Sequence, residues 1–122
     1  MEQEYIKGDI VMYDNKIHTI MDTLGINNYE LSCVKHPVHQ LELSGVPLTL
    51  EILEKNGWKD DGYDWYRLPT KRAYLYITKD ITTLGEFLVC VGLDRHNLAS
   101  INFVHQLQHL LFGLNINSEM EV

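Results

Sequence analysis

The sequence predicts an α+β protein. An SH3-like β-rich N-terminal part is followed by a short helix, a three-stranded antiparallel sheet and a C-terminal helix packed on that sheet. Three observations predict this order: short stretches of alternating apolar and polar residues up to residue 46, helical spacing after Pro47, and helical spacing again over 101–114. The expected parts are 1–46, which is β-rich, and 47–122, whose helices and sheet pack together as one unit.

Four strands are expected in the N-terminal part. Apolar residues alternate in GDIVMY and KIHTIM, which flank Asp14 and Asn15, two residues suited to a tight hairpin turn. The stretches YELSCV and VHQLEL supply the third and fourth strands, with Pro37 between them. Strands of about five residues at such short spacing favour a small, strongly bent antiparallel sheet of the SH3-like kind.

The later elements are marked by helix caps and turn residues. A short helix is expected between Thr49, a candidate N-cap, and Asn56 with Gly57, a typical helix end. Three strand stretches follow: YDWYRL, RAYLYIT and EFLVCVG. LDRHNLAS is then expected to be a loop, with Ser100 as the N-cap of the final helix over 101–114.

Composition excludes several classes of protein. The chain has 122 residues, 45% apolar and 22% charged, as an ordinary globular protein does, and its apolar runs are too short for a membrane helix or an export signal. The net charge of −7 disfavours direct nucleic-acid binding and leaves open an acidic surface that faces a basic protein partner. Cys33 and Cys90 are expected to be free thiols in apolar strands, which favours a reducing cytoplasm.

The polar residues of the final helix fall into two sets. Gln108 lies inside the wide apolar arc, so it is expected to be buried and to bond backbone groups of a neighbouring strand or loop. His105 and His109, one turn apart, fall with Gln106 on the narrow polar stripe. They could hold a metal, but the helix lacks the accompanying acidic residue, which favours a stripe that faces solvent or a partner.

A second set of potential zinc ligands comprises Cys33, His36, His39 and His18. Residues three apart in a strand point to opposite faces, so one core cysteine and two histidines at a loop edge are the favoured interpretation. We therefore expect no metal and no cofactor.

The stretch DDGYDWYR contains three carboxylates among aromatic residues. Such carboxylates could serve acid–base catalysis or bind a cation, but Asp61 with Gly62 is more typical of a hairpin turn, and no catalytic residue is assigned. Tryptophan, tyrosine and arginine are frequent at the centres of protein interfaces. The candidate partner-binding residues are therefore Tyr63, Trp65, Tyr66, Arg67, His105 and His109.

A different interpretation of the second half is a site for an anionic ligand such as a nucleotide. The basic candidates are Arg67, Lys71, Arg72, Arg95 and His96. The corresponding pocket would be lined by Tyr63, Tyr74, Tyr76 and His96.

Two stretches carry a resemblance to known sequences. They read GVPLTLEILEKNGW over 45–58 and VHQLQHLLFGL over 104–114. Together they resemble a family of small uncharacterised proteins carried by bacteriophages and prophages of gut bacteria, whose segments read G-I-P-L-T-x-E-x-L-x-K-x-G-F and V-H-Q-L-Q-N-L-Y-F-A-L. The chain departs from the second segment at His109, Leu111 and Gly113. The resemblance implies a phage-borne origin and no particular chemistry.

The function expected from these observations is non-catalytic protein binding by an accessory protein of a phage or mobile element, in the cytoplasm of the host cell. One version inhibits a host defence or nucleic-acid-handling protein that has a basic surface. Two alternatives stay open. The protein could bind or hydrolyse a small anionic ligand, or it could be a virion or assembly component that forms a homo-oligomer.

Overall fold

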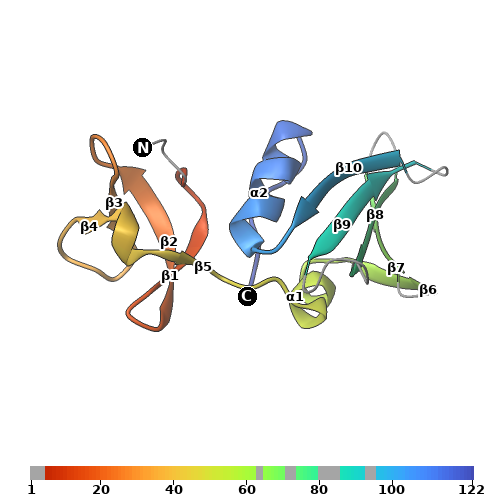
Figure 1. Cartoon of the computed structure of the whole chain (residues 1–122), viewed down its shortest axis with the longest axis horizontal. Coiled ribbons are helices and arrows are strands. Elements are labelled where there is room, and N and C mark those ends of the chain that lie inside the picture. The colour runs from red at the N-terminus through yellow and green to blue at the C-terminus, as the bar shows by residue number, and fades with distance from the viewer. Residues whose placement is uncertain (1–4, 63–64, 71–73, 80–85, 93–95) are drawn as a thin grey trace. The chain divides into compact units, whose positions relative to one another are not determined.

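The computed structural model shows a mostly β protein with two five-stranded antiparallel sheets, one short helix and one C-terminal helix (Figure 1). It describes residues 5–62, 65–70, 74–79, 86–92 and 96–122. The chain divides into an N-terminal unit, Met1–Pro47 with Phe103–Met120, and a C-terminal unit, Leu48–Asn102 with Glu121–Val122. The C-terminal helix is thus grouped with the N-terminal sheet, whereas the sequence assigned it to the same unit as the C-terminal sheet.

The N-terminal unit combines short strands with two helical segments. Its elements are β1 (Ile10–Tyr13), β2 (Lys16–Thr23), β3 (Asn28–Leu31), β4 (Val38–His39), the 3-10 helix η1 (Gln40–Glu42), β5 (Ser44–Gly45) and α2 (Val104–Gly113). The strand order is β4-β3-β2-β1-β5, and Figure 1 shows the sheet curled into a half-barrel. The expected strand VHQLEL pairs over two residues only and then turns into η1.

The turn after β1 follows the sequence prediction, whereas the segment after β3 does not. Asp14 and Asn15 have φ angles of 50° and 61°, the left-handed conformation of a tight hairpin turn. Cys33 was expected to be a core cysteine in an apolar strand. It is exposed, with φ 62°, because the chain leaves the sheet in a turn at this point.

The C-terminal unit has a larger sheet than the sequence predicted. Its elements are α1 (Leu50–Lys55), β6 (Lys59–Gly62), β7 (Trp65–Pro69), β8 (Tyr74–Lys79), β9 (Phe87–Val91) and β10 (His96–Ile101), with strand order β10-β9-β8-β7-β6. The expected three strands correspond to β7, β8 and β9. The two edge strands were not predicted, since KDDG lacks apolar residues and HNLASI is bulged and lacks alternation.

The boundaries of both helices follow from their caps. The side-chain oxygen of Thr49 accepts the N–H of Ile52 at 3.2 Å, as predicted for the start of α1, and Gly57 has φ 89° just beyond its end. Helix α2 begins three residues later than predicted. Ile101 is part of β10 and pairs with Phe87, so the N-cap is Phe103 and Ser100 lies within the strand.

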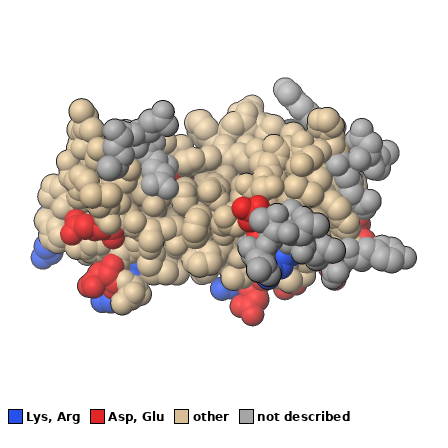
Figure 2. Space-filling view, viewed as in Figure 1, with Lys and Arg blue, Asp and Glu red and all other residues tan. Residues whose placement is uncertain are grey.

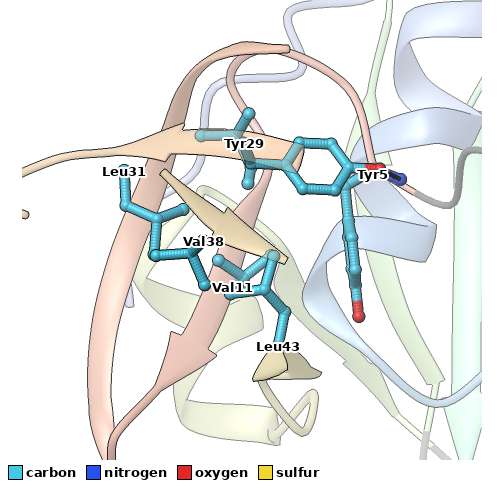
Figure 3. Close-up of a cluster of buried hydrophobic side chains, with 7 residues drawn as sticks. Tyr5, Val11, Tyr29, Leu31, Val38 and Leu43 are labelled. Atoms are coloured by element: carbon cyan, nitrogen blue, oxygen red, sulfur yellow. Dashed lines mark hydrogen bonds between the residues drawn. The ribbon is translucent and has the colours of Figure 1, made fainter. Parts of the chain in front are cut away.

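Each unit has its own apolar core. In the N-terminal unit, Tyr29 is fully buried beside the ring of Tyr5 and several aliphatic side chains (Figure 3). Its hydroxyl donates to Oε1 of Gln40 at 2.8 Å. The C-terminal unit buries Leu53, Trp58, Ile77 and Val89. Within the described residues, no helix combines the length and apolar composition that crossing a bilayer requires.

Candidate functional sites

The polar side chains of α2 bind the segment that precedes β1. Gln108 is 4% exposed, and its Oε1 accepts the N–H of Ile10 at 2.9 Å. Its Nε2 donates to the carbonyls of Gly8 at 3.0 Å and Ser118 at 3.1 Å. This is the arrangement that the helical spacing predicts for Gln108, and it fixes α2 to the backbone on both sides of Asp9.

The next residue of the helix, His109, meets the side chain of Asp9. His109 Nε2 lies 2.6 Å from Asp9 Oδ2, the same oxygen that accepts the N–H of Ile6 at 2.9 Å. The Asp9 side chain is 2% exposed, and that of His109 35%. Burial raises the pKa of Asp9, although the hydrogen bonds from Ile6 and His109 act in the opposite direction. A buried carboxyl therefore orients an imidazole that remains accessible.

His105 was expected on the solvent-facing or partner-facing stripe, and this prediction is wrong. The residue is buried, with the ring of Tyr5 at 5.0 Å edge-on and that of Phe103 stacked at 5.8 Å. Burial, and then the charge of His109, lower the pKa of His105 to about 4. Its Nδ1 has no hydrogen-bond partner among the described residues. His105 is thus unavailable as a surface contact, because a residue a hundred positions earlier covers it.

The two stretches that carry the resemblance meet where α2 begins. The N–H of Val104 donates to the carbonyl of Val46 at 2.9 Å, and Pro47 forms a bridge with Phe103. A Cβ on Gly45 would lie 2.5 Å from Phe103 Cγ, so only glycine allows this approach. Gln106 Oε1 accepts the N–H of Phe103 at 3.1 Å and so caps the helix.

The predicted aromatic partner-binding residues lie on β7 but not on one face of it. Trp65 and Arg67 share a face, whereas the Tyr66 hydroxyl bonds Glu54 of α1 at 3.3 Å. The Arg67 guanidinium is 3.5 Å from Asp61 and 4.9 Å from the centre of the Tyr74 ring. The charge of Arg67 is therefore already compensated within its own sheet. Tyr63 lies outside the described residues.

The residues proposed for an anionic ligand are brought together only in part. Tyr74 and Tyr76 lie side by side, with ring centres 6.4 Å apart, and Arg67 stacks on the first of them. His96 starts β10, two strands away from β8. Lys71, Arg72 and Arg95 lie outside the described residues.

The histidines near Cys33 bind local backbone groups. His18 Nδ1 donates to the carbonyl of Ser32 at 2.7 Å, and His39 Nδ1 accepts the N–H of Leu41 at 3.1 Å. In the described part of the chain, no group of three or more His, Cys, Asp or Glu residues could hold a metal ion.

One apolar surface was missed by sequence reasoning. Ile26 and Leu41 are 82% and 75% exposed. Asn28 pairs with His39, and the N–H of Gln40 bonds the carbonyl of Asn27 at 2.8 Å. Ile26 lies in the bend that leads into β3 and Leu41 lies in η1, so each is two residues away from this paired end of β3 and β4. We call this pair the Ile26–Leu41 surface; its only signal in the sequence is an isolated isoleucine in the turn LGINN.

Acidic residues lie on the same sheet as this surface. Asp22 and Glu30 face each other across β2 and β3, and both are exposed, which is an unfavourable pair in isolation. The N-terminal unit carries eight acids and three lysines, whereas the C-terminal unit carries nine acids and seven basic residues. In Figure 2, most charged side chains in view on the N-terminal unit, at the left, gather near its lower edge.

No protein-family model, curated protein or solved structure matches this chain.

Proposed function

We propose that the chain is an accessory protein of a phage or mobile element that binds a basic protein of the host cytoplasm and catalyses no reaction. The observation that carries the proposal is the Ile26–Leu41 surface, in which two large, mostly exposed aliphatic side chains lie next to the paired ends of β3 and β4. In this proposal the curled, SH3-like sheet is the binding part, and the inhibited partner is a host defence or nucleic-acid-handling protein.

The energetic argument rests on the cost of leaving these side chains in water. Single exposed aliphatic residues are common on protein surfaces, whereas two beside the same pair of strand ends offer a partner two apolar contacts. Covering one such side chain completely contributes about 1.5 to 3 kcal/mol. The pair can therefore supply the apolar centre of a small interface.

The charge of the N-terminal unit selects the kind of partner. Its net charge of −5 includes Asp22 and Glu30, whose mutual repulsion a lysine or arginine of the partner would relieve. A basic surface, such as that of a nucleic-acid-handling protein, complements this charge and would associate at a rate that falls steeply with salt.

The test is affinity purification from a lysate of the bacterium that carries the gene, with three versions of the chain. We expect one basic protein to be retained by the wild type and by Phe112→Ser, a control at an exposed aromatic residue of α2, and to be lost with Ile26→Ser combined with Leu41→Ser. Retention should weaken as salt is raised. A partner held equally by all three versions would contradict the proposal.

A virion or assembly role predicts a different result in the same preparations. If a second copy of the chain covers the Ile26–Leu41 surface, light scattering should show an oligomer for the wild type and a monomer for the double variant. That result would replace the host-protein proposal with self-assembly.

A further inference from the structure

The contact between residues 5–9 and α2 contains one carboxyl group, Asp9, and two imidazoles, His105 and His109, that the proposed binding function does not use. We propose that this contact is an acid-sensitive device, in which His105 takes up a proton in mildly acidic solution and residues 5–9 then separate from α2. The proposal is independent of the Ile26–Leu41 surface.

The geometry explains why His105 cannot be charged while the contact is closed. Its ring contacts those of Tyr5 and Phe103, and its Nδ1 has no hydrogen-bond partner among the described residues. An imidazolium ion there would be desolvated and without a counter-ion, which is a costly arrangement. Separation of residues 5–9 removes Tyr5 from the ring and admits water.

The other charged groups around the contact do not compensate for a charge on His105. From α2, His109 is one turn away with ring centres 5.7 Å apart, so its own positive charge opposes a second one. From residues 5–9, the Asp9 carboxyl is bound to His109, and Lys7 is exposed. The only ionisable side chain of strand β1 is that of Tyr13, whose ring contacts His18 and His36. In the segment that follows α2, Glu119 is exposed.

The direction of the pH effect follows from the two states of His105. Its pKa is about 4 when the contact is closed and returns to the ordinary 6.5 when it is open. Between these values the open state binds a proton that the closed state does not, so acid favours opening. From about pH 7.5 to about pH 5, this difference raises the opening equilibrium roughly 30-fold.

Asp9 acts in the opposite direction and moderates the response. Because burial raises the pKa of Asp9 in the closed state, the closed state binds a proton on Asp9 more readily than the open state does, so protonation of Asp9 opposes opening. The net response of the wild type is therefore smaller than that of His105 alone, and Asp9→Asn should make the response steeper.

Opening would remove contacts that hold α2 in the N-terminal unit. Gln108 bonds the backbone of Ile10 and Gly8, and His109 bonds Asp9, so all three polar contacts lie next to the segment that moves. The Gly8 N–H donates to the carbonyl of Ile20 in β2 at 2.8 Å. Its hydrogen exchange therefore shows whether the same segment also leaves the sheet.

The test is amide hydrogen exchange of the full chain, followed by NMR at about pH 7.5 and about pH 5 and corrected for intrinsic exchange rates. Protection of the Gly8 and Ile10 amides should fall by between about 5- and 30-fold at the lower pH, whereas that of Ile77 in β8 should change by less than about threefold. Protection of Gly8 and Ile10 that does not depend on pH would overturn the proposal.

Two further measurements assign the effect to His105. His105→Phe keeps a ring against those of Tyr5 and Phe103 but cannot take up a proton, so the pH dependence at Gly8 and Ile10 should fall below about threefold. The His105 ring can also be titrated in the wild type, which requires no variant to fold. Titration near 6.5 with unchanged protection, or an undiminished response in His105→Phe, would refute the role of this residue.

Discussion

The two units bury different kinds of side chain. The polar or charged residues found buried in the described structure are Asp9, Gln40, His105 and Gln108, and all four belong to the N-terminal unit. The described side chains buried in the C-terminal unit are aliphatic or aromatic, apart from the thiol of Cys90. In the N-terminal unit, hydrogen bonds from a helix far along the chain help to hold the sheet, so we call it the polar unit. The C-terminal unit is held by apolar packing, and we call it the apolar unit.

This difference shows how chain connectivity shapes a small core. Each unit contains about sixty residues, a size at which burial alone leaves little stability to spare. The C-terminal unit is formed by one nearly continuous segment, so its strands can follow an apolar pattern. The N-terminal unit includes α2, which follows the first 47 residues of that unit only after the whole C-terminal sheet. Hydrogen bonds from Gln108 to Ile10 and from His109 to Asp9 fix the position of that helix.

The largest expected effect tests the apolar unit. Ile77 is fully buried in β8, so Ile77→Ala should lower the free energy of unfolding by about 2 to 5 kcal/mol through lost burial and the cavity left behind. Both tryptophans, Trp58 and Trp65, belong to this unit, and their fluorescence reports its unfolding in denaturant. The exposed Leu98→Ala is the matched control and should cost less than about 1 kcal/mol. Equal losses in the two variants would contradict apolar packing as the basis of this unit.

The next effect tests the polar unit. Gln108→Leu leaves the Ile10 N–H and the carbonyls of Gly8 and Ser118 without their partner and should cost about 1 to 3 kcal/mol. Far-UV circular dichroism in denaturant measures the loss, and exchange of the Ile10 amide locates it. If Gln108→Leu is as stable as the wild type, the hydrogen bonds do not define the position of α2.

Features set by local chemistry could be predicted from the sequence. The turn at Asp14 and Asn15 and the cap at Thr49 depend on residues within three positions of each other, which a sequence pattern contains. Gln108 could be placed because helical periodicity alone assigns it to the apolar arc.

Features set by distant contacts could not be predicted. His105 falls on the polar stripe of its helix and is buried only because Tyr5 lies against it. Phe112 falls in the apolar arc and is 66% exposed, since no described segment covers that end of the helix. The edge strand β10 was missed because the bulge between Asn97 and Ala99 interrupts its alternation and only Ile101 of its residues is buried.

A smaller effect is expected at α1, which belongs to the apolar unit but is capped by a polar side chain. Thr49→Ala removes the acceptor for the Ile52 N–H and should cost about 1 kcal/mol. Thr49→Ser keeps a hydroxyl at the same position and should restore most of the loss in the same fluorescence measurement. If serine and alanine behave alike, the hydroxyl does not cap the helix.

The smallest effect tests whether the polar unit needs the charge of Asp9 or only its oxygen. Both hydrogen bonds to Asp9 end on Oδ2, so the single carbonyl oxygen of Asp9→Asn can accept both, and stability should change by less than about 1 kcal/mol. The folded state raises the pKa of Asp9, so wild-type stability falls relative to the variant as the pH rises through that pKa. Denaturation at about pH 4 and about pH 8 should therefore show Asp9→Asn gaining on the wild type at the higher pH. A gain by the wild type would mean that the ionised pair with His109 outweighs the cost of burial, and that this unit depends on a charge as well as on hydrogen bonds.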